Sequence, residues 1–229
     1  MAGSRIFNGS NAISLGTNSG SAVNSLAGFT ICAWMYRAAS GTNAISYSAG
    51  SNSSNAVVLW WYGADNKIYF DTRTSGSQYC YTGADTSTGW VHWAGVFRGG
   101  VSWAIYKNGV SQSITNNGSP PSNTSTSLST VTAYLGHVNW SGSIWTASGN
   151  ALGWCSIHNV DLGENEIQSI MRTPNVGRGM IGCWSNTANE SSTSSKWEST
   201  WAGSYGGTPY NATVGTSLLT PNVSFGKSH

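Results

Sequence analysis

Carboxylates are the first candidates for chemistry in this chain, because glycoside hydrolysis uses a pair of them. Asp65 and Asp71 flank one expected strand, but six residues at about 3.3 Å each place them roughly 20 Å apart. Catalytic carboxyl pairs in glycosidases lie about 5 to 9.5 Å apart. Glu164 and Glu166 point to different sides of an expected helix and suit its N-terminus. The eight acids are Asp65, Asp71, Asp85, Asp161, Glu164, Glu166, Glu190 and Glu198. We therefore predict no catalytic residues and no enzymatic activity.

Histidines and cysteines form no pattern typical of a nucleophile or a metal site. Serines surround His92, His137 and His158, but no G-x-S-x-G elbow accompanies them, and we predict a structural role for His92. The histidines have no close ligand partner in the sequence, so zinc is not expected. The cysteines are Cys32, Cys80, Cys155 and Cys183. None forms a C-x-x-C pair, and we interpret them as buried small hydrophobic residues, with two disulfides as the alternative.

No cofactor is expected. Calcium takes six to eight oxygen ligands, usually with two or more carboxylates among them. A weak calcium site built from carbonyl groups and Asp85 or Asp161 stays open as an alternative.

The aromatic side chains indicate that the remaining function is ligand binding. Trp and Tyr faces stack on the C–H surfaces of sugars, while Asn, Ser and Thr hydrogen-bond the hydroxyls. Residues 138–145 place two Trp in a Gly/Ser setting that predicts a loop, and residues 78–81 offer a second aromatic pair. The candidate glycan or partner contacts are Asn139, Trp140, Trp145, Tyr79 and Tyr81. The alternative is that these rings cover the core or an oligomer interface.

The composition indicates a rigid, turn-rich β protein. Only 8% of residues are charged, against about 25% in ordinary soluble domains, while 12 Trp and 10 Tyr argue against disorder. Lys and Arg are scattered singly, so nucleic acid and anionic membranes are not expected partners. No apolar run is long enough to span a bilayer, and the first residues lack the pattern of a signal peptide.

Strand-like runs alternate with turn signals along the chain. Asn108-Gly109 is typical of a type I′ hairpin turn, and Gly99-Gly100 and residues 64–66 predict two further hairpins. We expect these hairpins to form an antiparallel meander, whose apolar face requires a second sheet. The clearest strands are Phe29–Tyr36, Ala56–Tyr62, Lys67–Thr72, Val91–Phe97, Val101–Tyr106 and Thr130–Leu135.

One short helix is predicted near 163–172. Gly163 can cap it, Ile167, Ile170 and Met171 form an apolar stripe, and Pro174 ends it. Residues 177–229 are rich in Ser, Thr and Gly, and we predict an irregular tail packed on a single domain that spans 1–229.

Several segments together resemble the concanavalin A-like, laminin-G-like jelly-roll family. The most specific match is Gly89–Phe97 with Ile105–Gly109, which is similar to the family's W-hydrophobic-H-hydrophobic-A strand and its LYVNG hairpin. The other matching segments are residues 6–11, 29–34, 155–167 and 180–184. The resemblance implies an all-β fold, an antiparallel sandwich of two sheets. It covers most of residues 4–172, and it leaves function open because this fold carries lectins, glycosidases and structural modules.

Family features of the active members are missing from this sequence. Glycosidases of this fold carry an E-x-D-x-x-E pattern on one strand, and it does not occur here. Calcium-binding relatives often place Asp in the opening turn, where this chain has Asn8-Gly9-Ser10-Asn11. The resemblance therefore favours a metal-free, non-catalytic member.

Two roles remain open. We expect a structural virion protein of a bacteriophage, a capsid decoration or fibre-type component at the virion surface, which contacts capsid or tail subunits, foremost the major capsid protein. It would form a homo-oligomer whose many copies bind host-surface glycans weakly. The alternative is an extracellular bacterial lectin or carbohydrate-binding module, and a glycoside hydrolase is a remote third option.

Overall fold

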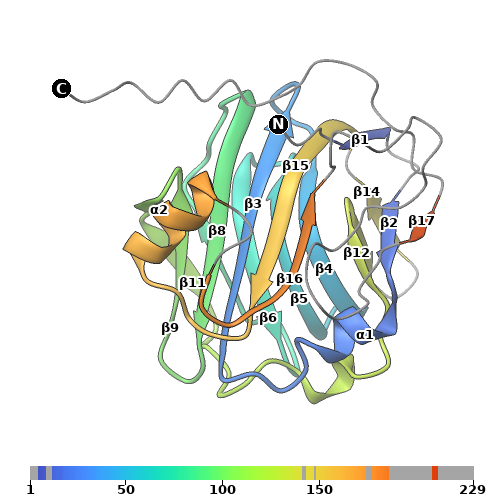
Figure 1. The fold of residues 1–229 in the computed structure, drawn as a ribbon, viewed down its shortest axis with the longest axis vertical. Coiled ribbons are helices and arrows are strands. Elements are labelled where there is room, and N and C mark those ends of the chain that lie inside the picture. The colour runs from blue at the N-terminus through green and yellow to red at the C-terminus, as the bar shows by residue number, and fades with distance from the viewer. Residues whose placement is uncertain are drawn as a thin grey trace.

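The computed structural model describes residues 5–8, 12–140, 143–146, 148–173, 177–185 and 208–210. In this part of the chain two antiparallel sheets pack face to face, with the first and last described strands at the same side of the sandwich (Figure 1). This sandwich of two antiparallel sheets confirms the predicted fold class.

The first sheet, which we call the front sheet, is built around a long strand pair. β3 and β8 pair without interruption from Gly28 opposite Arg98 to Arg37 opposite Gly89. In spatial order its strands are β1 (Arg5–Asn8), β15 (Ser148–His158), β3 (Gly28–Arg37), β8 (Gly89–Arg98), β9 (Ser102–Lys107) and β10 (Val110–Ser111), with β16 (Met180–Ser185) also paired to β15.

The second sheet, the back sheet, has β5 and β6 near its centre. In spatial order its strands are β11 (Ile114–Asn117), β7 (Tyr79–Thr82), β6 (Lys67–Arg73), β5 (Asn55–Tyr62), β4 (Ala44–Asn52), β12 (Ala133–Leu135), β2 (Ala12–Leu15) and β17 (Thr208–Tyr210). A separate hairpin pairs β13 (His137–Trp140) with β14 (Ser143–Thr146).

The core lies between the sheets and is filled by alternate residues of each strand. Trp61 of β5 and Trp93 of β8 meet there edge to face, with ring centroids 5.4 Å apart. Gly95 of β8 leaves room for the Phe70 ring, because a Cβ at Gly95 would lie 2.6 Å from that ring. The two sheets are therefore held at a spacing that a glycine on one and an aromatic ring on the other determine together.

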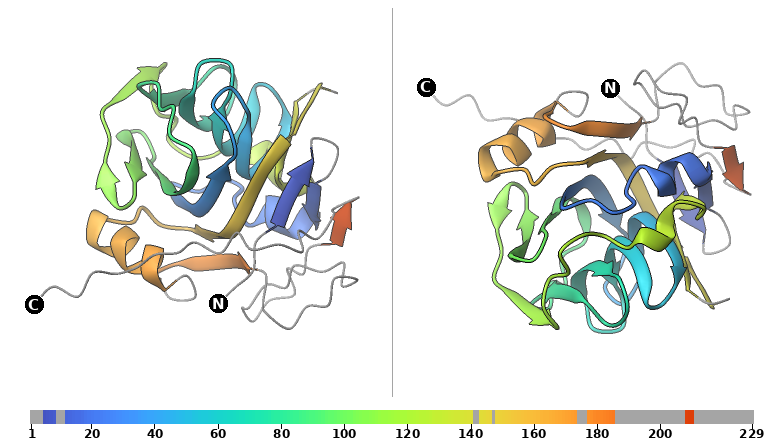
Figure 2. Two further views of the ribbon diagram at one scale, coloured as in Figure 1. Left: turned by 90° about the horizontal axis from the view of Figure 1, so that it is seen from above. Right: turned by 90° about the horizontal axis from the view of Figure 1, so that it is seen from below.

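The helices are short. They are α1 (Gly16–Ser21), the 3₁₀ turn η1 (Thr126–Leu128) and α2 (Glu164–Arg172). α2 covers the outer face of the front sheet, as Figure 2 shows, and buries Ile167 and Ile170 against it. Gly163 precedes its first turn and donates its backbone N–H to Glu166. The predicted helix is confirmed, and no helix in the described ranges has the length and apolar character needed to cross a bilayer.

The predicted hairpins are present, but the predicted single meander is wrong. Asn108 and Gly109 have φ values of 50° and 79°, as a type I′ turn requires. However, the hairpin of β8 and β9 lies in the front sheet and that of β5 and β6 in the back sheet. The hairpin closed by Asn108 and Gly109 joins β9 to β10 and shares the front sheet with that of β8 and β9. The three predicted hairpins are therefore divided between the two sheets, and the local turn signals do not say which sheet receives a hairpin.

Two further expectations need correction. Residues 138–145, predicted as a loop, contribute to the β13–β14 hairpin, in which Val138 lies opposite Trp145 and Asn139 opposite Ile144. Val, Ile and Trp favour strands, and this preference outweighs the Gly/Ser setting. The strand expected over Thr130–Leu135 is limited to its last residues, β12.

In the tail, β16 extends the front sheet and β17 pairs with β2 in the back sheet. Residues 186–207 and 211–229 lie outside the described part of the chain. The division into one domain with an irregular tail over 177–229 stays a prediction.

Candidate functional site

Aromatic side chains gather on the outer face of the back sheet, the face turned away from the core. We call this surface the aromatic face. Cross-strand pairing places Trp60 of β5 opposite Tyr69 of β6, and Tyr69 opposite Tyr81 of β7. Because alternate residues of a strand share a face, Tyr62 and Tyr79 join them. The aromatic face comprises Trp60, Tyr62, Tyr69, Tyr79 and Tyr81.

Tyr69 is the centre of this group. Its ring centroid lies 5.7 Å from that of Trp60, 6.0 Å from that of Tyr62, 5.7 Å from that of Tyr79 and 5.3 Å from that of Tyr81. Trp60 is 5% exposed, whereas the four tyrosines are half-buried. Trp60 therefore forms the floor, and the tyrosines present ring surface to solvent.

A buried carboxylate holds the floor in place. Asp71 is fully buried on the same face of β6, and its Oδ2 accepts a 2.8 Å hydrogen bond from Nε1 of Trp60. Nε of Arg73 donates to Oδ1 of Asp71 at 2.7 Å. Burial raises the pKa of Asp71, although Arg73 and Trp60 stabilise its ionised form. The Arg73 guanidinium also lies 5.0 Å over the ring of Tyr79.

The other end of β6 repeats this arrangement closer to solvent. The hydroxyl of Tyr69 donates a 2.6 Å hydrogen bond to Oδ2 of Asp65, and burial and this contact raise the pKa of Tyr69. Nζ of Lys67 lies 3.5 Å from the same Asp65 oxygen and 4.6 Å over the ring of Tyr81. Both cations of the face thus cover tyrosine rings while paired with carboxylates.

The predicted contacts divide into two groups. Tyr79 and Tyr81 lie on the aromatic face, beside Tyr69. The β13–β14 hairpin borders this face, because its Val138 packs in one cluster with Trp60. The side chains of Asn139, Trp140 and Trp145 lie outside the described part of the structure.

The sequence analysis did not predict three residues of the aromatic face, Trp60, Tyr62 and Tyr69. A signal was present in the alternate positions 67, 69, 71 and 73 of β6, which are all polar or aromatic. In β5 no such signal exists, because both faces of that strand are apolar and both are buried.

The carboxylates of the aromatic face are badly placed for hydrolysis. Asp65 lies in the turn before β6 and Asp71 lies within β6, with Tyr69 between them. The four strand steps from Lys67 to Asp71 alone correspond to about 13 Å. Each already accepts hydrogen bonds within the face. Among the described residues no three His, Cys, Asp or Glu side chains gather as metal ligands would.

The two acids considered for calcium are engaged by cations. Nζ of Lys107 lies 2.5 Å from Oδ2 of Asp85, and Nε of Arg98 lies 2.9 Å from Oδ2 of Asp161. Burial alone would raise the pKa of Asp85, but hydrogen bonds from Lys107 and Ser87 hold it below its ordinary value. Asp85 instead fixes the loop that also binds the buried guanidinium of Arg37.

Two histidines are buried in the front sheet. Nε2 of His158 lies 3.1 Å from Oγ of Ser156, and Nδ1 lies 3.0 Å from the carbonyl oxygen of Arg178. Ser156 and His158 are both fully buried, so a substrate does not reach this Ser-His pair. His92 lies between Trp34 and Trp154, at 5.6 Å and 5.3 Å between ring centroids. The structural role predicted for His92 agrees with this burial.

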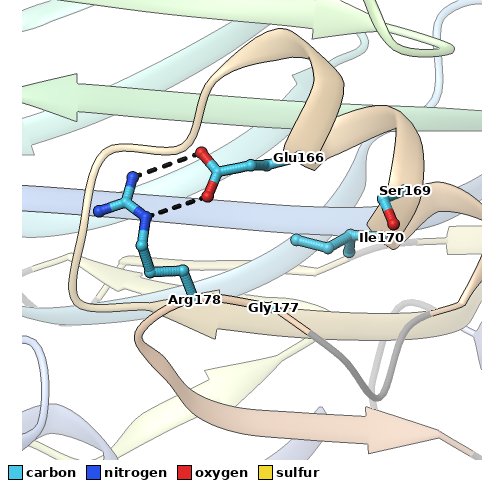
Figure 3. A pocket seen from close by; sticks show the side chains of 5 residues that line it. All are labelled: Glu166, Ser169, Ile170, Gly177 and Arg178. Carbon is cyan, nitrogen blue, oxygen red and sulfur yellow. Dashed lines mark hydrogen bonds and ion pairs between the residues drawn. The ribbon is translucent and has the colours of Figure 1, made fainter.

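A hollow beside α2 is another surface feature that could accept a ligand (Figure 3). Its walls include Glu166 and Ile170 on one side and Arg178 on the other. Nε of Arg178 donates to Oε1 of Glu166 at 3.0 Å, and Nη2 donates to the carbonyl oxygen of Asp161 at 2.8 Å. Both charges are used to tie α2 to the segment before β16. The charged groups of this hollow therefore hold α2 against the segment before β16 and are not available to a ligand.

Comparisons with known proteins agree with the observed architecture. The sequence model of the concanavalin A-like lectin/glucanases superfamily matches residues 7–168. No curated protein sequence matches the chain.

Solved structures share the fold at low identity. A Bacteroides ovatus protein assigned to carbohydrate binding has a TM-score of 0.62 and 14% identity, over 94% of this chain and 60% of that one. The CBM40 module of the Ruminococcus gnavus IT-sialidase, bound to α2,3-sialyllactose, has a TM-score of 0.54 and 8% identity, over 74% and 96% of the two chains. Domains LG4-5 of the mouse laminin α1 chain have a TM-score of 0.51 and 13% identity, over 72% and 44%.

Proposed function

The chain belongs to the concanavalin A-like lectin/glucanases superfamily, and from this premise we propose that it is a non-catalytic carbohydrate-binding protein whose aromatic face contacts the sugar. The observation that carries the proposal is the cluster centred on Tyr69, with four tyrosine rings half-buried on one sheet face. Half-buried rings on a rigid sheet offer flat apolar surface without the entropic cost of ordering a loop.

Polar groups at the edge of the rings support a sugar as the ligand. Thr115 and Asn117 of β11 lie opposite Tyr81 and Tyr79. Hydroxyl and amide groups both donate and accept hydrogen bonds, which matches the hydroxyls of a sugar. Two of the structural neighbours point the same way, since one is assigned to carbohydrate binding and the other is bound to sialyllactose.

Glycan-array binding by the purified full chain tests the proposal. A double variant, Tyr79→Ala with Tyr81→Ala, removes two rings from the face and should weaken binding by about tenfold or more, since each aromatic contact contributes about 1 kcal/mol. Tyr36→Ala is the matched control, because Tyr36 is a half-buried tyrosine of the front sheet that packs on Trp90 at 5.4 Å. Equal binding by the double variant and the control would end the proposal.

The absence of catalysis is part of the proposal and has its own measurement. Incubation of the bound glycan with the protein should release no reducing ends. Its support is that Asp65, in the turn before β6, lies on the far side of Tyr69 from Asp71, together with the hydrogen bonds that each carboxylate already accepts. Product formation that disappears in Asp71→Asn would contradict this part.

A narrower role as a bacteriophage virion component is proposed from composition. Only 8% of residues are charged, and a charge-poor aromatic surface suits packing on capsid or tail subunits in many copies, where weak glycan contacts add up. Quantitative mass spectrometry of purified particles should find the protein in fixed ratio to the major capsid protein. Its recovery from bacterial culture medium in the absence of particles would favour the alternative, an extracellular lectin.

A further inference from the structure

We propose, on the basis of the proposed function, that the aromatic face selects uncharged oligosaccharides that lie across strands β5, β6 and β7, and that it rejects carboxylated and sulfated sugars. The inference depends on the number of charged side chains on the face and on how they are paired. In the strands of the face, in their neighbours β4 and β11, and in β12 beyond β4, the only cations are Lys67 and Arg73.

Arg73 is committed to a carboxylate of the same face. Its Nη2 lies 2.6 Å from Oδ1 of Asp71, and the two side chains are 12% and 0% exposed. Its Nη1 also donates to the carbonyl oxygen of Ser53 at 2.9 Å. An anionic sugar could recruit Arg73 only by leaving Asp71 ionised, buried and without its cation, which is a costly state.

Lys67 is committed in the same way at the other end of β6. Its partner Asp65 also accepts the Tyr69 hydroxyl, so that a sugar carboxylate near Lys67 would meet the like charge of Asp65. The four charges of the face sum to zero, and each cation has its acid within ion-pair distance. An uncharged sugar meets no such repulsion and needs no pair to break.

The direction of the ligand follows from the register. Trp60, Tyr69 and Tyr81 are direct cross-strand neighbours on three adjacent strands, and Thr115 continues the row on β11. Trp60 lies at the floor of this row, and the exposed part of the row from Tyr69 to Thr115 crosses two strand spacings of about 4.8 Å, or about 10 Å, which exceeds a single sugar ring. We therefore expect an oligosaccharide that runs across the strands, with affinity that rises with chain length until the row is covered.

A glycan array of neutral oligosaccharides of increasing length, each beside its uronic-acid, sialylated or sulfated counterpart, tests the inference with the full chain at neutral pH. We expect neutral glycans to bind at least about tenfold more tightly than their acidic counterparts, with little dependence on salt. Asp65→Asn keeps an acceptor for Tyr69 but frees Lys67, and should raise binding of the acidic glycans several-fold in a salt-dependent manner. Asp161→Asn, which frees Arg98 outside this face, is the matched control and should change nothing.

The outcomes separate the inference from the function on which it rests. If acidic glycans bind as well as neutral ones, and the Tyr79→Ala, Tyr81→Ala double variant loses both, the charge selectivity is overturned while the aromatic face remains the binding site. If glycan binding is absent or survives the double variant, the proposed function fails and the selectivity fails with it.

Discussion

The indole Nε1 of Trp60 donates its hydrogen bond to Oδ2 of Asp71 at 2.8 Å, across adjacent strands and out of contact with solvent. This bond fixes the orientation of the one ring that forms the floor of the aromatic face. The same carboxylate anchors Arg73, whose guanidinium lies over Tyr79. Asp71 therefore positions two sides of the cluster without touching the ligand surface itself.

We expect Asp71→Asn to lower the free energy of unfolding by about 3 kcal/mol, since removal of one partner of a buried ion pair leaves the other charge uncompensated. The amide can still accept from Trp60, so the loss reports on the charge. Urea unfolding measures it. Asp65→Asn is the control: its pair with Lys67 is partly exposed, and a change below about 1 kcal/mol is expected. Equal losses in the two variants would contradict the role given to Asp71.

The buried imidazoles predict a dependence of stability on pH. Burial lowers the pKa of His92 to about 3 and that of His158 to about 4. Both are neutral in the folded chain, whereas the unfolded chain takes up protons below about pH 6.5. Because the unfolded state then binds more protons, the free energy of unfolding should fall as pH drops from about 6.5 toward 4. The slope should approach about 1.4 kcal/mol per pH unit for each histidine, as measured by urea unfolding.

The His92→Phe variant measures the contribution of His92 to the pH dependence of the free energy of unfolding. Among the described residues, neither ring nitrogen of His92 has a hydrogen-bond partner. An apolar ring of similar size between Trp34 and Trp154 should therefore raise stability by about 1 kcal/mol at neutral pH and flatten the acid slope. His158→Phe should instead lower stability by about 1 to 3 kcal/mol, because Ser156 and the carbonyl of Arg178 lose their partner. An unchanged slope in His92→Phe would refute the view that the buried, neutral His92 contributes to the loss of stability at acid pH.

The four cysteines should behave as inert thiols. All four are buried, which confirms their predicted burial, and burial raises the pKa of Cys32, Cys80 and Cys155. Cys32 and Cys183 lie on either side of Ser156, so they are two strand spacings, about 10 Å, apart and beyond disulfide reach. We expect Cys32, Cys80 and Cys155 to react slowly with a thiol reagent in the folded protein and fast in guanidinium. Fast labelling of the folded chain would show that the thiols are accessible.

The sequence contained the local features of this fold more clearly than its long-range arrangement. Asn108-Gly109 and the segment after Gly163 could be predicted, because turn geometry and helix capping depend on a few adjacent residues. The assignment of hairpins to sheets could not, since it depends on which apolar faces meet in the core. The β13–β14 hairpin was missed because Gly and Ser masked a segment of strand-forming residues.

The candidate site was predictable only in part. Tyr79 and Tyr81 stood out because they are two aromatic residues at alternate positions of a polar segment. Trp60 and Trp61 are adjacent in an apolar run that is buried on both faces, and only the pairing with β6 shows that Trp60 faces outward and Trp61 inward. The roles of Asp71 and Arg73 likewise could not be predicted, because they depend on the position of Trp60 beside Asp71.

Gly95 is the position where the core should tolerate a methyl group least. A Cβ there would lie 2.6 Å from Cγ and Cδ2 of Phe70, and the ring cannot withdraw because it is fully buried between the sheets. Gly95→Ala should therefore separate the sheets locally and lower the free energy of unfolding by about 1 to 3 kcal/mol in urea. Gly83→Ala is the matched control, since Gly83 is exposed and a Cβ there meets no atom within 4 Å. A Gly95→Ala protein as stable as the control would mean that the two sheets do not meet at Phe70 as described, and the outward orientation of Tyr69, its neighbour on β6, would then be in doubt.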